Sequence, residues 1–336
     1  MENKVKNQKN KAIGKRNMFL AIVTVVLTVV LGIICVLFSP ANGYVTIDGV
    51  EYSVGGSVCG YEEGIVDASI LEHIDGVPVT YISWYAFQDC TSLETINIPD
   101  NVTAIDSNAF IGCTSLRKIS MPDSLDDRYS FGGFSGCTSL ESIEIPDGVT
   151  HISNNAFEAC ASLRDVEIPD SVISIGSSAF YGCTSLNSVD IPDGITEIKD
   201  GTFCGCASLE TINIPNGVMS IGSSAFAECT SLTSITIPDS VTTLGGGFAG
   251  GAFIGCTSLT DVSISNSIKE IGMFAFAECT SLTSVYIPDS VTYLSSEAFT
   301  GCDNLTLVSI PSDLEVEKSF LANAESSAWM FAIRRR

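Results

Sequence analysis

A cysteine recurs at nearly regular intervals along most of this chain, and each one stands three residues before a leucine. The ten cysteines are Cys90, Cys113, Cys137, Cys160, Cys183, Cys206, Cys229, Cys256, Cys279 and Cys302. Successive members lie 23 residues apart, except for one gap of 24 and one of 27. A period in the twenties is typical of solenoids, in which each unit buries its apolar side only against its neighbours. The spacing therefore predicts a stack of coils.

One repeat shows how a coil is built. The alternating apolar residues at the end of Leu93–Ile98 predict a short strand. Pro99 and Asp100 end it, because proline lacks a backbone donor and aspartate favours turns. Val102–Ile105 predicts a second extended piece, and Ser107–Cys113 predicts a turn or a single helical turn. Stacked coils should place the strands side by side in one parallel sheet, with columns of apolar side chains inside.

The repeat reads Leu-x-x-Ile-x-Ile-Pro-Asp-x-Val-x-x-Ile-Gly-x-x-Ala-Phe-x-x-Cys, as in Ile168–Cys183 and Ile214–Cys229. This pattern resembles the BspA-type class of leucine-rich repeats over about residues 74–310. The resemblance implies a leucine-rich repeat solenoid, with a parallel β-sheet of short strands on one side and turns or single helical turns on the other. It also implies a surface-exposed protein of bacteria or of some protozoan parasites, with adhesion or host-protein binding known for few members.

Two units depart from the pattern. Asp126–Tyr129 replaces the Ile-Gly step of one unit, and Gly245–Gly251 contains four extra residues in another. Both predict a loop that bulges from an edge of the solenoid. Residues 245–250 also match the Gly-x-Gly-x-x-Gly fingerprint of dinucleotide sites, but that motif must join a strand to a helix. Here it interrupts a coil, so it predicts a flexible glycine-rich insertion.

The N-terminal region predicts a membrane anchor. Residues 18–38 contain no charged side chain and, as a helix, would span roughly 30 Å of hydrocarbon. Residues 1–17 carry six Lys or Arg and one Glu, so the positive-inside rule places this tail in the cytoplasm and the repeats outside the cell. A signal peptide cleaved near Ala41 is the alternative and would give a secreted protein. The apolar run is longer than the usual signal core, which favours the anchor.

These features divide the chain into five parts. They are a cytoplasmic basic tail (1–17), a transmembrane helix (18–38), an N-terminal cap with a first partial repeat (44–89), the leucine-rich repeats (90–313) and a C-terminal cap (314–336). Within the first cap, Tyr44–Val54 alternates around Asp48 and Gly49 and predicts a hairpin. In the second cap, apolar residues of Leu314–Ile333 recur at helical spacings and predict a closing helix.

The charge of the repeat region limits its partners. The whole chain has a formal charge of −23, and removing the basic tail (+5) and the three terminal arginines (+3) leaves −31 for residues 40–333. So acidic a region disfavours nucleic acid and anionic membrane surfaces, whereas a basic partner is compatible with it. Part of this charge simply keeps a long exposed molecule soluble.

No residue pattern in the chain indicates catalysis, a metal site or a cofactor site. His73 and His151 are the two histidines, and neither lies beside a recognised nucleophile motif. No Cys-x-x-Cys pair with a nearby histidine completes a zinc site. A column of Asp residues after the strands could hold calcium weakly, although the turns alone explain aspartate there. We therefore expect a protein that is not an enzyme.

The thiols should form a buried ladder. Equivalent cysteines on successive coils would lie about 4.8 Å apart, farther than the roughly 3.5 to 4.5 Å between the Cβ atoms of a disulfide. We therefore expect reduced thiols that pack as small apolar residues. Cys59 and Cys204 lie outside the ladder and are the more reactive candidates.

The best candidate for binding is the outer face of the predicted strands, because side chains between the apolar positions should project there in ordered columns. One column is Asn97, Ser120, Glu144, Glu167, Asp190, Asn213, Thr236, Ser263, Tyr286 and Ser309. The residues chosen as the candidate site are Glu141, Glu144, Arg164, Asp165, Glu167, Asp190 and Tyr286.

The sequence thus favours a non-catalytic, membrane-anchored surface protein that binds a protein or glycan, in adhesion or another interaction with a host or cell. A basic partner fits the acidic centre of the face, and affinity would come from many weak contacts. A passive spacer or surface-coat component is the alternative.

Overall fold

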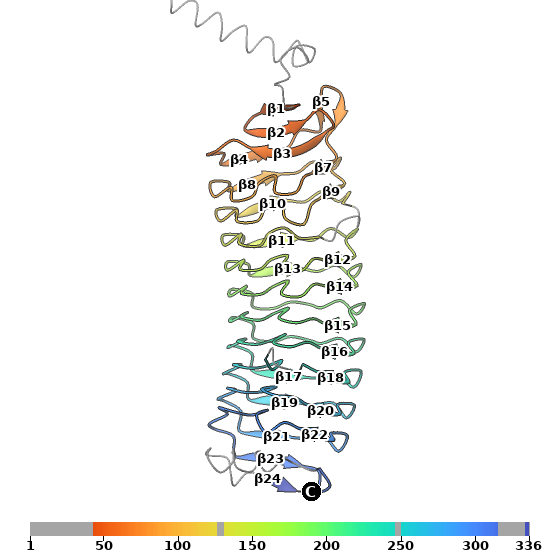
Figure 1. Cartoon of the computed structure of the whole chain (residues 1–336), viewed down its shortest axis with the longest axis vertical. Helices are drawn as coiled ribbons and strands as arrows, with labels where there is room; N and C mark the ends of the chain where they lie inside the picture. Colours follow the sequence, from red (N-terminus) through yellow and green to blue (C-terminus); the bar gives the residue numbers. More distant parts are fainter. Residues whose placement is uncertain (1–42, 126–130, 246–249, 315–332, 336) are drawn as a thin grey trace, which may run out of the picture.

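The computed structural model describes residues 43–125, 131–245, 250–314 and 333–335. These residues form an elongated solenoid, with the N-terminal cap at one end and β24 at the other (Figure 1). All regular elements within them are β-strands, and the strands of successive coils pair in parallel. The solenoid predicted from the repeat is therefore confirmed. The corner predicted at Ser107–Cys113 consists of turns and not of a helix.

The first strand of each coil lies on one side of the solenoid, which we call the strand face. Its strands are β4 (Asp67–Ser69), β8 (Thr95–Asn97), β10 (Lys118–Ser120), β11 (Ser142–Glu144), β13 (Asp165–Glu167), β17 (Ser234–Thr236), β19 (Asp261–Ser263), β21 (Ser284–Tyr286), β23 (Leu307–Ile310) and β24 (Ile333–Arg335). Pairing is in register, with Ile119 opposite Ile96 and Val166 opposite Ile143. A single parallel bridge joins Asp190 to Asn213 in the middle of the face.

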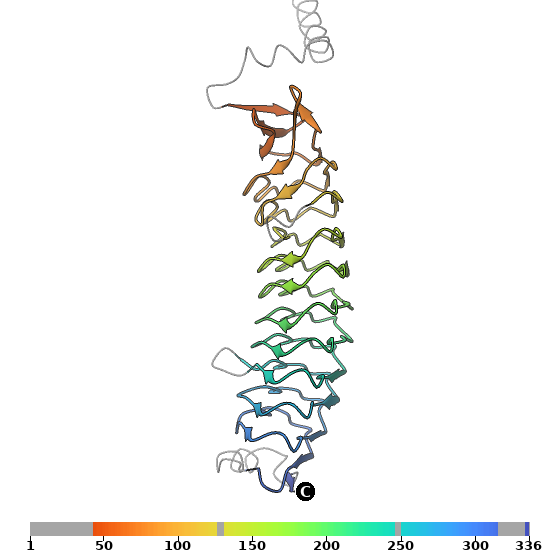
Figure 2. The ribbon, with the colours of Figure 1, turned by 90° about the vertical axis from the view of Figure 1, so that its right-hand side faces the viewer.

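A second column of shorter strands follows the turn that ends each first strand (Figure 2). Its strands are β7 (Tyr81–Ile82), β9 (Ala104–Ile105), β12 (His151–Ile152), β14 (Ser174–Ile175), β15 (Glu197–Ile198), β16 (Ser220–Ile221), β18 (Thr243–Leu244), β20 (Glu270–Ile271) and β22 (Tyr293–Leu294). The turn between the columns closes on its proline, as when the Val102 N–H donates to the Pro99 carbonyl at 3.0 Å. Proline accepts here without needing a donor of its own.

The N-terminal cap begins with three antiparallel strands, β1 (Tyr44–Ile47), β2 (Val50–Ser53) and β3 (Ser57–Tyr61). Asp48 and Gly49 both have positive φ, 49° and 80°, as the two central residues of a type I′ turn require. The predicted hairpin is confirmed. β3 then pairs in parallel with β7, which joins the cap to the second column, and a small hairpin, β5 (His73–Ile74) with β6 (Val77–Pro78), projects beside it.

Two stacks of buried side chains run through the coils. The phenylalanine rings of successive coils stack nearly parallel, with centroids 5.3 to 5.7 Å apart from Phe87 to Phe299. The cysteine ladder lies beside them, and all ten thiols are buried. The burial expected for the ladder is confirmed. Phe226 and Phe253 remain 5.3 Å apart although the 27-residue gap lies between their coils, so the extra residues leave the core unchanged.

The ladder thiols also donate hydrogen bonds, which the sequence did not indicate. Each thiol from Cys113 onward donates to the phenylalanine carbonyl of the preceding coil, at 3.0 to 3.3 Å. In most coils the same carbonyl also accepts the N–H of its own coil's cysteine, as Phe87 does from Cys90 at 3.1 Å. Cysteine thus fills a small apolar site and also satisfies the second lone pair of a buried carbonyl.

Several predicted features lie outside the described residues. They are the basic tail (1–17), the transmembrane helix (18–38) and most of the two loops at Asp126–Tyr129 and Gly245–Gly251. Within the parts that the structure describes, no helix has the length and apolar character needed to cross a bilayer. Residues 315–332 of the predicted C-terminal helix are likewise outside, but Ile333 belongs to strand β24 and not to a helix. There, pairing with β23 prevailed over helical spacing.

Candidate binding face

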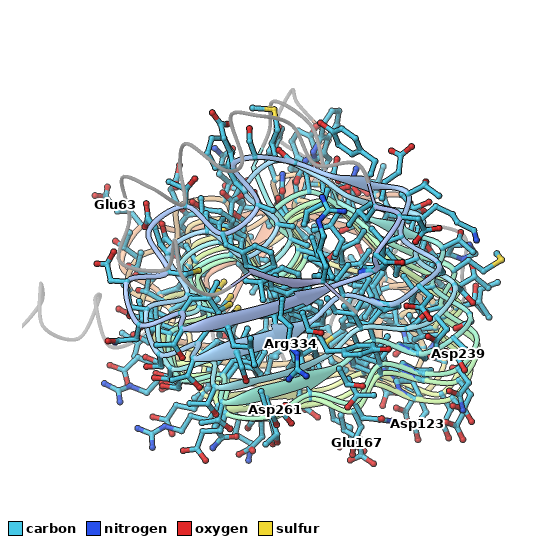
Figure 3. The ribbon with its side chains drawn as sticks, turned by 90° about the horizontal axis from the view of Figure 1, so that it is seen from below. Glu63, Asp123, Glu167, Asp239, Asp261 and Arg334 are labelled. Carbon is cyan, nitrogen blue, oxygen red and sulfur yellow. The ribbon has the colours of Figure 1, made fainter. Side chains whose placement is uncertain are left out.

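The strand face places the predicted column of side chains on the surface. From Asn97 to Tyr286 the members of this column are exposed, and Ser309 is half-buried. The residues on either side of an exposed position are buried or half-buried, and around Glu144 both Ile143 and Ile145 are buried. This alternation arises because successive side chains of a strand point to opposite faces. Viewed along the solenoid axis, Glu167 and Asp261 project outward from this side (Figure 3).

The predicted acidic residues come together at the centre of the face. Glu144 lies directly opposite Glu167 on the neighbouring strand, and Ser142 lies opposite Asp165. Asp190 takes the same position in the next coil along the chain and pairs onward with Asn213. Like charges in register on adjacent strands repel each other, so a cationic partner would relieve a cost that the free protein carries.

Glu141 and Arg164 flank this group. They occupy equivalent positions in adjacent coils, where the Arg164 N–H donates to the Glu141 carbonyl at 3.0 Å, and both are exposed. With the neighbouring acids they form one surface, which we call the central patch. It consists of Glu141, Glu144, Arg164, Asp165, Glu167 and Asp190.

Tyr286, the remaining predicted residue, does not belong to the central patch. It lies four coils beyond Asp190, roughly 19 Å away at the usual strand spacing. Its strand pairs with β23 and then β24, which aligns Tyr286 with Ser309 and Arg334. Tyr286 is 50% exposed and Leu307, one strand further, is 39% exposed. Sequence reasoning missed Leu307 and Arg334, because only the strand register places them near Tyr286.

The column of turn residues does not assemble a metal site. Asp100, Asp123 and their equivalents are exposed, and Figure 3 shows Asp123 and Asp239 at the corner beside the strand face. Among the described residues, no three His, Cys, Asp or Glu side chains come close enough to hold a metal ion together. A calcium ion takes six to eight oxygen ligands. Single acids repeated once per coil therefore fit turn formation better than ion binding.

The titratable candidates for chemistry stay apart. His73 lies in β5 of the cap and His151 lies in β12, so the fold does not bring the two histidines together. Cys59 and Cys204 are half-buried, unlike the ladder thiols. Burial, followed by the charge of Glu228, raises the pKa of the Cys204 thiol, which disfavours the reactive thiolate. Both cysteines lie outside the buried ladder, as predicted, but the environment of Cys204 does not favour the reactivity expected of it.

Comparison with known proteins agrees with this architecture. The chain matches the model of the BspA type leucine rich repeat region in six copies, over residues 71–162, 127–249 and 247–328. A leucine-rich repeat protein of T. pallidum is 34% identical, and the match covers 57% of this chain and 89% of that chain with a TM-score of 0.51. No curated protein matches.

Two other solved structures are similar over most of the chain. A leucine rich cell surface protein from Faecalibacterium prausnitzii is 28% identical, with 88% of this chain and 95% of that chain covered and a TM-score of 0.49. A leucine-rich repeat protein from Bacteroides ovatus is 26% identical, with coverages of 87% and 99% and a TM-score of 0.49.

Proposed function

The chain belongs to the BspA-type leucine-rich repeat family, and from that premise we propose that it is a non-catalytic surface protein that binds a protein or a glycan through the strand face. One observation carries the proposal. A rigid parallel stack holds rows of exposed polar side chains in register along the length of the molecule. Such a surface is ordered before binding, so a partner loses little affinity to the ordering of side chains and backbone.

The central patch is the proposed contact for the partner. Its members are five acids and one arginine, and the acids Glu144 and Glu167 face each other across adjacent strands. A basic protein is the partner that this arrangement favours, because neutralising either acid removes a repulsion as well as forming an ion pair. Exposed ion pairs are individually weak, so affinity would come from several coils acting together.

The test of the patch uses a matched control. In one variant Glu144, Glu167 and Asp190 are replaced by Lys. In the control, Asp147, Asp170 and Asp193 are replaced by Lys, because these residues lie in the turns of the same three coils and give the same change of charge. Cells displaying the full chain are then scored for attachment to immobilised basic proteins, neutral proteins and glycans.

We expect the patch variant to lose attachment at least about ten-fold more than the control. Equal loss in both variants would mean that net charge alone matters and would reject the patch. If the repeats are exposed on the cells but the cells attach saturably to none of the tested surfaces, a passive spacer or surface-coat role is favoured.

We propose also that residues 18–38 anchor the protein in the cell membrane with the repeats outside. The uncharged segment and the basic residues before it support this orientation. A tag after Arg336 and protease treatment of intact cells would test it. Loss of the tag from cell-associated full-length protein supports the anchor. A shorter product in the medium would show cleavage near Ala41 and secretion, and a fully protected tag would place the repeats inside the cell.

A further inference from the structure

A cavity of about 520 Å³ lies where the N-terminal cap meets the first coils. Glu72 of the cap lines one side, and Asp100 and Asn101 of the first Pro-Asp turn line another. Asn97 and Ser120, the first two members of the exposed column, also line it, so the cavity opens onto the strand face. Its volume is within the range of ordinary ligand pockets, roughly 300 to 1,000 Å³.

The cavity arises because the cap replaces a turn by a hairpin. In the regular coil, three residues separate Ile98 at the end of the strand from Val102, whereas eight residues separate Ile70 from Val79 in the cap. The extra residues form the β5–β6 hairpin, which leaves the stack instead of packing under the next turn. The hollow lies between Glu72, at the base of the hairpin, and the first two coils.

Asn101 holds this hollow open. Its Nδ2 donates to the carbonyls of Val79 at 2.6 Å and Glu72 at 2.7 Å. In two other coils a serine at this position reaches only the carbonyl equivalent to that of Val79, as Ser171 does at 2.7 Å and Ser290 does at 2.7 Å. The longer asparagine thus ties the base of the hairpin to the first coil, and its Oδ1 is buried without a hydrogen-bond partner.

The side chains that line the cavity offer mainly hydrogen-bond acceptors. Glu72 and Asp100 contribute carboxylates, while Asn97 and Ser120 can accept from a donor or donate to an acceptor. No Lys or Arg occurs from residue 43 to residue 116, where eleven acids occur. A group with several N–H donors and a positive charge complements such walls, as an ammonium or guanidinium does.

We propose that this cavity binds a lysine or arginine side chain of the partner protein that lies along the strand face. This inference rests on the proposed function and adds to it the type of side chain that the N-terminal end of the strand face recognises. The carboxylates pair with the cationic group, and Met121 together with the proline of the turn contacts the methylene stem. An amino sugar would offer the same cationic donor, so the test must separate these two sources.

The test titrates the full-length chain in detergent with N-acetyl-arginine amide and N-acetyl-lysine amide, followed by saturation-transfer NMR. Glucosamine is titrated in parallel. The variant is Glu72→Gln with Asp100→Asn, and the control is Asp147→Asn with Asp170→Asn, which removes two charges from equivalent turns outside the cavity. All variants are compared with wild type by circular dichroism.

We expect the arginine or lysine amide to bind the wild-type protein with millimolar affinity. It should bind the Glu72/Asp100 variant about five-fold more weakly and the control with an affinity within about two-fold of wild type. Unchanged affinity in that variant, or equal loss in the control, would overturn the proposal. Tighter binding of glucosamine than of either amide would assign the cavity to a sugar and overturn it also. The assay needs no macromolecular partner, so its failure leaves the central patch to its own test.

Discussion

The regular coils and the N-terminal cap bury their apolar side chains in different ways. In the coils each strand pairs in parallel with the equivalent strand of a neighbouring coil, whereas the cap begins with the antiparallel strands β1, β2 and β3. The coils repeat the same buried phenylalanine and cysteine, while the cap buries Tyr52, a residue with no counterpart in the repeats. Coils therefore depend on their neighbours, and the cap depends on contacts of its own.

This difference also separates the two proposed contacts. The central patch lies on coils that repeat with little change, so its chemistry comes only from which side chains occupy the exposed positions. The cavity exists because the cap departs from the repeat at the β5–β6 hairpin. The regular part therefore supplies an extended surface, and the junction with the irregular part supplies a concave one.

Breaking the phenylalanine stack in the middle should have the largest effect. Phe180 is fully buried, with ring centroids 5.3 Å from Phe157 and 5.5 Å from Phe203. Phe180→Ala should lower the free energy of unfolding by about 3 to 5 kcal/mol, measured by urea denaturation followed by circular dichroism. Phe87→Ala at the first coil should loosen mainly that end. If both substitutions lowered the free energy of unfolding by the same amount, this would contradict the dependence of each coil on its neighbouring coils.

Alkaline pH should destabilise the coils through the thiol ladder. Burial raises the pKa of Cys183 and of Cys256 to about 12. The folded state favours the neutral thiol. Each thiol therefore makes its full contribution to the free energy of unfolding below roughly pH 8.5, the pKa of a thiol in the unfolded chain, and this contribution is lost as pH rises towards 12. The loss is about 4 kcal/mol for each thiol at pH 12.

The slope of unfolding free energy against pH between 9 and 12 measures this effect. The double variant Cys183→Ala, Cys256→Ala should be less stable at pH 7 but should lose stability more slowly as pH rises. Leu186→Ala is the control, because it removes buried atoms from a coil without removing a titratable group. A slope in the double variant as steep as in wild type would exclude these thiols as the cause.

Within the cap, a smaller and more local effect is expected. The Tyr52 hydroxyl accepts the Leu71 N–H at 3.1 Å, and Tyr52 is fully buried. Tyr52→Phe leaves that N–H without its partner and should cost about 1 to 3 kcal/mol. Hydrogen exchange should become faster in β2 and β4 and stay unchanged in the coils beyond β13. Faster exchange throughout the solenoid would show that the cap and coils unfold together.

The smallest expected effects come from the residue before each ladder cysteine, which has positive φ in every coil. Ala159 has φ 58° and Gly182, its equivalent one coil later, has φ 70°. Ala159→Gly should stabilise by about 1 kcal/mol and Gly182→Ala should destabilise by a similar amount, because alanine is strained there. A Cβ on Gly182 would lie 3.7 Å from Ala159 Cα, so it meets no clash. Thermal denaturation would check both signs, and a shift in the same direction for both would contradict the explanation.

Prediction from the sequence succeeded where the repeat determines the environment. The positions of Phe110 and Cys113 in the period were enough to place both in the core, and Pro99 marked the end of a strand. It failed where a contact joins residues that share no pattern. Ile333 was the last residue of the segment predicted as a helix but lies in β24, and Tyr286 was grouped with acids that lie about four strands away.

The sequence by itself determined the stack of coils, the buried columns and the exposed row of the strand face, because each follows from a period that every unit repeats. Only the tertiary structure decided that each ladder thiol from Cys113 onward donates to a carbonyl of the preceding coil and that Tyr286 lies near Leu307 and Arg334. It alone placed Glu72 beside Asp100 around one cavity. These contacts depend on the register between coils and on the path of the cap, and neither leaves a periodic signal in the chain.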